Sequence, residues 1–371
     1  MIKVLVVDDS ALMRKHLVTL LESEGGFQVR VARNGVEALS LLSSFDPDVI
    51  TLDINMPEMD GITCLSHIMV NKPKPVVMVS SLTEKGAEAT LQALSLGAVD
   101  YVHKPDGTIS LSIERVHREL LLKVKGAARA RVRTALGLSD ALQKARLSNR
   151  EHRQERPAGL SPISNAADMG LVLIGVSTGG PGTLEEILPL LPVNFPWAVL
   201  VAQHMPGSFT NVFAKRMDSV CAMPVQEVSR QSPIEPGKIY VAKGDADLVV
   251  MGRGKSLLAV PVPSSQDHLW HPSVTRLVTS AMESVAVDKL IGVLLTGMGD
   301  DGAAAMAELR RRGGRTIAQD EATSIVFGMP SELIRLGGAA VVLPSHAIAR
   351  AITTWLYPST LTNRSRPYGA R

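Results

Sequence analysis

The sequence has few of the residues that stabilise small extracellular or zinc-dependent proteins. Its two cysteines, Cys64 and Cys221, stand far apart among 371 residues and form no CxxC pattern. Neither a disulfide scaffold nor a zinc knuckle is supported, and this cysteine usage fits a reducing cytoplasm.

Long apolar runs and a strong excess of one charge are also missing. No uninterrupted apolar run reaches the roughly 18 residues of a membrane span. The first residues, MIKVLVVDDS, place two aspartates where a signal peptide would need its cleavage site. The net charge of +3, from 39 basic and 36 acidic residues, does not by itself indicate binding to nucleic acid or membranes. We expect a cytoplasmic protein without membrane insertion.

The composition is that of a globular protein, with 45% hydrophobic residues, and at roughly 150 residues per domain the length predicts two or three domains. In residues 1–124, short apolar runs alternate with helical patterns. The runs cover residues 2–7, 29–32, 49–52, 76–79 and 99–102. Strands that are apolar on both faces, with helices between them, predict a five-stranded parallel, doubly wound domain that binds ligands at the carboxyl ends of its strands.

Polar residues stand at these strand ends: Asp8 and Asp9 after the first run, Asp53 after the third, Ser80 after the fourth and Lys104 after the fifth. Three crowded carboxylates would repel one another unless a cation lay among them, and an all-oxygen donor set suits Mg²⁺. A carboxylate beside Mg²⁺ can attack phosphorus and form an acyl phosphate. Each aspartate alone is more simply a cap or turn residue, but the ordered set favours the site.

This region resembles the response-regulator receiver domain over about residues 1–123. The resemblance implies that a histidine kinase phosphorylates Asp53, and that Asp8, Asp9, Asp53 and the backbone carbonyl of Asn55 hold Mg²⁺. It also implies a set of switch and phosphate-contacting positions, which are Ser80 (with Thr83 as an alternative), Tyr101, and Lys104 in a Lys104–Pro105 turn.

Residues 125–168 have a different composition. Between Lys123 and Arg156 the chain carries ten Lys or Arg and three Asp or Glu, a local net charge of 10 − 3 = +7. We interpret this stretch as a basic, flexible linker, which is either a solvated connector or a contact for an acidic partner. Residues 357–371 form a polar tail.

Residues 169–356 predict a second α/β domain with a mainly parallel sheet. Apolar strands are expected at residues 171–176, 198–202 and 290–295, with later strands at 316–318 and 340–343. Three closely spaced short strands, at residues 239–242, 248–251 and 256–260, predict an antiparallel insert. Helices are expected at residues 272–287 and 301–312.

The sequence Gly175-Val176-Ser177-Thr178-Gly179 lies between a predicted strand and a helix, the position of a nucleophile elbow. A phosphate-binding loop or a dinucleotide-binding turn would be alternatives, but neither the Gly-Lys-Ser/Thr ending nor a GxGxxG pattern is present.

The next strand ends in His204, which could serve as a base. The glycine-rich loop TGMGDDG could supply oxyanion-binding amides, and either Asp300 or Asp301 could orient the imidazole. A helix N-cap is the other interpretation of these aspartates, and we favour it for Asp300. His268 and His271, near Asp267, could form a metal pair, although a solvent-exposed loop is the simpler interpretation.

The motifs IGVSTGG, AQHMP and LLTGMGDDG resemble those of the catalytic domain of the chemotaxis protein-glutamate methylesterase (CheB) family. The resemblance implies that Ser177 is the nucleophile, His204 the base and Asp301 the third triad member. Thr178 and Met298 would help to form the substrate and oxyanion pocket. It further implies a phosphorylation-controlled hydrolase that removes methyl groups from glutamates of chemotaxis receptors, deamidates certain receptor glutamines, and needs no cofactor at the esterase site.

We expect a monomer with no nucleic-acid partner; a response regulator with a binding-only output domain and a different serine esterase or amidase are the alternatives. Two segments depart from the family pattern. Lys243 and Asp247 occupy IYVAKGDADLVV, and Trp270, His271 and Thr275 replace the more usual HRPSVD. Both are predicted to lie outside the triad and to affect substrate recognition only.

Overall fold

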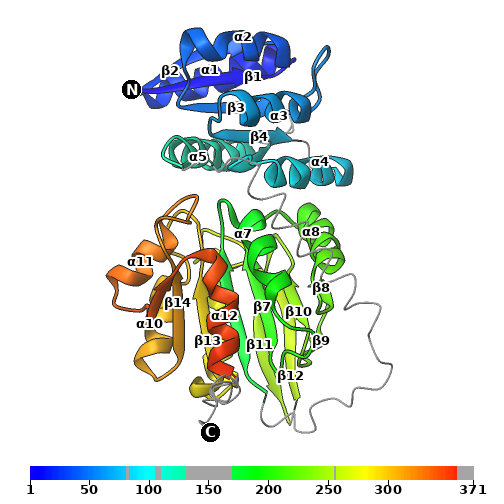
Figure 1. Ribbon diagram of the computed structural model, residues 1–371, viewed down its shortest axis with the longest axis vertical. Helices are drawn as coiled ribbons and strands as arrows, with labels where there is room; N and C mark the ends of the chain where they lie inside the picture. Colours follow the sequence, from blue (N-terminus) through cyan, green and yellow to red (C-terminus); the bar gives the residue numbers. More distant parts are fainter. Residues whose placement is uncertain (81–82, 105–109, 131, 133–168, 255, 357–371) are drawn as a thin grey trace, which may run out of the picture.

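The computed structural model describes residues 1–80, 83–104, 110–130, 132, 169–254 and 256–356. The predicted tail, most of the predicted linker and Pro105 lie outside these residues. Figure 1 shows two α/β domains, one formed by the first 127 residues and the other by residues 169–356. No helix within the described ranges is long and apolar enough to cross a membrane.

The N-terminal domain has the predicted five-stranded parallel sheet, and its strand order is β2-β1-β3-β4-β5. Strands β3 and β4 are buried along their whole length, because helices cover both faces of the sheet. Its strands are β1 (Ile2–Val7), β2 (Phe27–Ala32), β3 (Val49–Asp53), β4 (Val76–Ser80) and β5 (Asp100–His103). Its helices are α1 (Ala11–Glu24), α2 (Gly35–Phe45), α3 (Gly61–Asn71), α4 (Glu84–Ser95) and α5 (Ser110–Ala127).

Helix α5 continues past residue 124, where the first domain was predicted to end. Val124 and Ala127 are both fully buried and belong to the apolar cluster under the sheet of this domain. The burial of this face explains why the helix extends into the basic stretch.

The C-terminal domain is built on a seven-stranded parallel sheet with the order β15-β14-β13-β6-β7-β10-β8. Its strands are β6 (Leu171–Val176), β7 (Ala198–Gln203), β8 (Val225–Val228), β10 (Ile239–Ala242), β13 (Leu290–Leu294), β14 (Arg315–Gln319) and β15 (Val341–Leu343). Its α-helices are α7 (Gly180–Ile187), α8 (Gly207–Val220), α9 (Val274–Ser284), α10 (Ala303–Arg311), α11 (Met329–Arg335) and α12 (Ser345–Leu356), with two short 3₁₀ helices, η2 (Leu188–Leu190) and η3 (Val287–Lys289).

The prediction for residues 239–242 was wrong. They form β10, which pairs in parallel with β7 and β8 inside the main sheet. All four residues are buried, as expected for a strand covered on both faces. The antiparallel insert exists, but it consists of β9 (Ser232–Pro233), β11 (Ala246–Arg253) and β12 (Ser256–Pro263).

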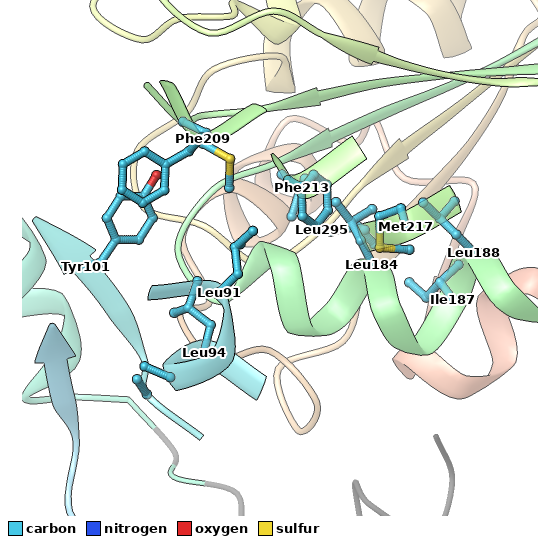
Figure 2. Packing of buried hydrophobic residues seen from close by; sticks show 14 of the residues in the cluster. Leu91, Leu94, Tyr101, Leu184, Ile187, Leu188, Phe209, Phe213, Met217 and Leu295 are labelled. Atoms are coloured by element: carbon cyan, nitrogen blue, oxygen red, sulfur yellow. The ribbon is translucent and has the colours of Figure 1, made fainter. Parts of the chain in front are cut away.

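The two domains share one apolar cluster. Helix α4 of the first domain packs against α7 and α8 of the second. Figure 2 shows Leu91, Leu94 and Tyr101 of the first domain facing Phe209 and Phe213 of the second. The rings of Tyr101 and Phe209 are stacked, with centroids 4.7 Å apart. The carboxyl ends of β6 and β7, which carry the predicted active site, therefore lie close to the first domain.

Candidate active site and phosphorylation site

Ser177 lies in the turn between β6 and α7. Its backbone N–H donates to the carbonyl of Thr296, 3.0 Å away, which ties the turn to the loop after β13. Gly179 adopts a φ of +75°, a conformation that glycine accepts without strain. A Cβ at Gly297 would lie 2.7 Å from the Cβ of Ser177, so the neighbouring loop can approach only as glycine. The predicted nucleophile elbow is thus present as a tight strand–turn–helix.

His204 and Asp301, which follow β7 and β13, are in direct contact. The Nε2 atom of His204 lies 2.9 Å from Oδ2 of Asp301, and both side chains are more than nine-tenths buried. Burial alone would raise the pKa of the Asp301 carboxyl, but hydrogen bonds from His204 and Thr275 hold this pKa well below its usual range. Asp301 therefore carries a negative charge and accepts the proton of Nε2.

The other imidazole nitrogen keeps its lone pair. Nδ1 of His204 is buried and has no hydrogen-bond partner within the part of the chain that the structure describes. Over those same residues no hydrogen bond joins the Ser177 hydroxyl to His204. Nδ1 is therefore the nitrogen that is free to accept a proton.

The segment from Trp270 to Thr275, predicted to lie outside the triad, contacts the His204–Asp301 pair. The Trp270 ring lies nearly parallel to the imidazole of His204, with centroids 5.6 Å apart and an interplanar angle of 9°. Thr275 donates to Oδ1 of Asp301 through its backbone N–H at 3.0 Å and its hydroxyl at 2.7 Å. This contact could not be foreseen, because nothing in the sequence spacing brings residue 275 to residue 301.

Asp247, in the other atypical segment, anchors the same region. Its fully buried carboxylate accepts from Nδ1 of His271 at 2.9 Å, from Arg276 at 2.7 Å and from the backbone N–H of Ser273 at 2.6 Å. The solvent-exposed interpretation is wrong for His271, whose side chain is 8% exposed. Asp267 is exposed and does not join this cluster.

Thr178 and Met298, predicted to line the pocket, both contact the first domain. The Thr178 hydroxyl donates to Oδ2 of Asp100 at 2.6 Å, and this contact is buried. A Cβ at Gly126, near the end of α5, would lie 3.2 Å from the terminal methyl carbon of Met298. Asp300 is exposed, and α10 has Gly302 at its N-cap with no capping side chain. The N-cap interpretation of Asp300 was therefore wrong.

The second predicted site lies at the carboxyl ends of β1 and β3. Asp8, Asp9 and Asp53 each offer a carboxylate oxygen, and these oxygens lie within 4.8 Å of one another. Nζ of Lys104 lies 2.8 Å from Oδ2 of Asp53 and 3.1 Å from Oδ2 of Asp8. The ammonium therefore forms ion pairs with both carboxylates. Burial raises the pKa of the Asp53 carboxyl, while Lys104 opposes that shift.

The remaining predicted positions of the first domain make contacts of their own. The Ser80 hydroxyl lies 3.3 Å from the carbonyl of Gly86, and Thr83 is the N-cap of α4, where its hydroxyl accepts from the Gly86 N–H. The exposed Asn55 follows β3, and its backbone N–H donates to Asp53. Tyr101 is buried between the domains, and burial raises the pKa of its hydroxyl far above the usual value.

Sequence reasoning missed Asp100 and Lys123. Nζ of Lys123, on α5, lies 3.3 Å from Oδ1 of Asp100 and 4.8 Å from the centre of the Tyr101 ring. Burial opposes the charge of Lys123, but Asp100 and Glu119 raise its pKa above the ordinary value. An acidic residue at the start of a buried strand was the available signal.

Comparisons with known proteins match both halves of the chain. Residues 4–113 match the response regulator receiver domain, and residues 172–352 match the CheB methylesterase domain. The protein is thus of the class in which a receiver domain is joined to a methylesterase domain. A protein-glutamate methylesterase/protein-glutamine glutaminase of Rhodospirillum rubrum is 63% identical over 359 residues, which is 96% of either chain. One from Rhodopseudomonas palustris is 50% identical, over 96% of this chain and 98% of the relative. The chain belongs to the CheB protein-glutamate methylesterase family.

Two solved structures from Thermotoga maritima resemble the separate halves. The CheB methylesterase catalytic domain is 37% identical, covers 50% of this chain and 98% of its own, and has a TM-score of 0.49. The CheB response regulator domain is 47% identical, covers 35% of this chain and 98% of its own, and has a TM-score of 0.33.

Proposed function

We propose that this chain is a phosphorylation-controlled serine hydrolase that removes methyl groups from glutamate methyl esters on chemotaxis receptors. The observation that carries the proposal is the buried His204–Asp301 pair at the strand ends beside Ser177. The full-length relatives named as protein-glutamate methylesterases supply the substrate class, and their second name supports deamidation of receptor glutamines. The proposed setting is the cytoplasm, as a monomer that takes part in sensory adaptation.

The proposed reaction begins with transfer of the Ser177 hydroxyl proton to Nδ1 of His204, while Asp301 holds Nε2. The serine oxygen then attacks the γ-carbonyl carbon of the glutamyl ester. His204 returns the proton to the departing methoxide, so methanol leaves and a glutamyl-serine ester remains. Water, deprotonated by His204, hydrolyses that ester and regenerates the serine. With a glutamine substrate, ammonia would leave in place of methanol.

The proposed control rests on the contacts between the two domains. In the arrangement described here, Asp100 engages Thr178, the residue after the proposed nucleophile, and Tyr101 stacks on Phe209. Arg216 of α8 donates to the Ser95 hydroxyl of α4 at 2.6 Å. These contacts would keep the first domain over the esterase site. Phosphorylation of Asp53 by a histidine kinase would favour a second, open arrangement, in which the first domain has moved away from the esterase site. This requires that the phosphoryl group interacts more favourably with the open arrangement than with the closed one.

The acidic cluster around Asp53 fits Mg²⁺. Its donor set is all oxygen, with one carboxylate oxygen from each of Asp8, Asp9 and Asp53 within 4.8 Å of the others. We propose that Asp8, Asp9, Asp53 and the Asn55 carbonyl hold the ion, which would neutralise charge as phosphate reaches Asp53. Lys104 would contact the transferred phosphoryl group through its ammonium.

The test measures methanol release from methylated receptors by the full chain, with and without acetyl phosphate as phosphodonor. We expect stimulation by acetyl phosphate, and Ser177→Ala should lower the rate by about 10³-fold or more. Native-rate methanol release by Ser177→Ala would refute the proposed nucleophile. Activity on small p-nitrophenyl esters without activity on receptors would favour a different esterase, and salt-dependent DNA binding without hydrolysis would favour a binding-only output domain.

A further inference from the structure

The segment 270–275 contacts both members of the His204–Asp301 pair. We infer that this segment positions the pair for catalysis, with Thr275 fixing the carboxylate of Asp301 and Trp270 fixing the imidazole of His204. The inference rests on the proposed function, because it assigns a purpose to contacts with the proposed base and its orienting acid.

Thr275 makes two of the hydrogen bonds that hold the Asp301 carboxylate. Its hydroxyl donates to Oδ1 of Asp301 at 2.7 Å and accepts from the backbone N–H of Gly302 at 2.9 Å. The backbone N–H of Thr275 donates to the same Oδ1 at 3.0 Å. Oδ2 receives the backbone N–H of Val274 at 2.7 Å, on the oxygen that binds His204. The threonine hydroxyl thus links the rotation of the carboxylate to the start of α10.

This residue type has a chemical consequence. An aspartate at position 275 would place a second carboxylate against Asp301, where like charges repel. A threonine supplies a neutral donor there instead. In this chain the carboxylate receives hydrogen bonds from the hydroxyls of Ser273 and Thr275 and from two backbone amides of α9, in addition to its contact with His204.

Trp270 packs against one face of the His204 imidazole and restricts its rotation. The indole and imidazole planes differ by 9°, and their centroids are 5.6 Å apart, which is an offset stacked arrangement. A Cβ at Gly299 would lie 3.3 Å from Nε1 of Trp270, so a glycine at this position leaves room for the indole ring. With Asp301 holding its edge and Trp270 its face, the ring keeps Nδ1 in one direction.

The segment 270–275 is itself anchored by the buried carboxylate of Asp247. Asp247 binds His271, Ser273 and Arg276, which lie on both sides of the cis peptide bond between His271 and Pro272. Ser273 caps α9 by accepting from the Arg276 N–H. Trp270 and Thr275 therefore project from one anchored segment, and their separation is fixed by the backbone between them.

The experiment compares variants of the full chain, activated with acetyl phosphate, for kcat and KM of methanol release from methylated receptors. Thr275→Val, which is close in size, should lower kcat by about tenfold or more and leave KM within about twofold, because the orientation of the base matters in the transition state. Thr275→Ser should keep kcat within about threefold of the unmodified chain. Thr279→Val, on the exposed face of the same helix, is the matched control and should change neither constant.

Thr275→Ala removes the same hydroxyl without adding a methyl group, so the Ser and Ala variants decide the question if the Val variant melts below the assay temperature. Trp270→Ala should lower kcat, and Trp270→Phe should restore most of it. The inference fails if Thr275→Val and Thr275→Ala keep full kcat, or if Ser and Ala lose it equally. Failure of the proposed function would differ, because Ser177→Ala would then retain activity.

Discussion

The hydroxyl of Thr178 in the esterase domain donates a buried 2.6 Å hydrogen bond to the carboxylate of Asp100 in the receiver domain. Thr178 follows the proposed nucleophile, and Asp100 precedes the proposed switch residue Tyr101. The contact therefore joins the neighbour of the proposed nucleophile to the neighbour of the proposed switch residue.

Removal of the Asp100 carboxylate should raise the activity of the unphosphorylated chain. A hydrogen bond to a charged group contributes about 1.5–3 kcal/mol, so Asp100→Ala should increase basal methanol release by about tenfold and reduce the further gain from acetyl phosphate. The matched control is Asp288→Ala, an exposed aspartate outside this contact. Unchanged basal activity in Asp100→Ala would show that the contact does not restrain the site.

Loss of the Asp53 carboxylate or of Mg²⁺ should remove stimulation without removing hydrolysis. Asp53→Asn, or chelation with EDTA, should bring activity in acetyl phosphate down to the basal level, because the acyl phosphate cannot form. Asp288→Asn serves as the control for the substitution. Basal hydrolysis that falls together with stimulation would instead assign the metal to the esterase site.

Replacement of Gly297 by alanine should damage the active site while the fold survives. The added Cβ would lie 2.7 Å from the Cβ of Ser177, and a displacement of about 1 Å can cost about 10²-fold in rate. Gly182→Ala, in α7, is the control because a Cβ there meets nothing within 4 Å. Circular dichroism and methanol release together test this, and full activity in Gly297→Ala would contradict the placement of the loop.

Asp247 should make the stability of the C-terminal domain depend on pH. Burial would raise the pKa of its carboxyl, but His271, Ser273 and Arg276 lower it below the ordinary value of 3.8. A lowered folded-state pKa stabilises the domain above pH 3.8, and this contribution is lost as the pH falls further. Asp247→Asn should weaken the domain at pH 7 and flatten the loss of stability below about pH 4.

Removal of one partner from a buried ion pair costs about 3–5 kcal/mol, which sets the scale for Asp247→Ala in urea unfolding. Tryptophan fluorescence reports this domain selectively, because Trp197, Trp270 and Trp355 all lie in it. Equal urea midpoints for Asp247→Asn and the unmodified chain at pH 7 would contradict the prediction.

The parts of the fold that depend on local sequence pattern could be predicted. Apolar runs ending in Asp8, Asp53 and Lys104 predicted both the five-stranded sheet and the meeting of these side chains, because parallel strands end at one rim. The same logic brought His204 and Asp301 together. These inferences use strand order and direction alone.

Contacts set by tertiary packing were not predictable in this way. Strand β10 resembles one arm of a hairpin in the sequence, and only its burial on both faces places it in the parallel sheet. The approach of Thr275 to Asp301 depends on how α9 packs beside α10, and the Asp100–Thr178 contact depends on how two domains dock. Neither arrangement leaves a periodic signal in the chain.

Strand β5 gives the protein a mechanical constraint. The strand begins with Asp100, which accepts a hydrogen bond from Thr178 of the esterase domain. Just past its other end, Lys104 forms an ion pair with Asp53. A shift of this four-residue strand would therefore alter both the Asp100–Thr178 contact and the Lys104–Asp53 contact. A foreign receiver domain fused to this esterase would therefore need a compatible residue at each end of its last strand. Without both residues, we expect that its phosphorylation would not change the activity of the esterase.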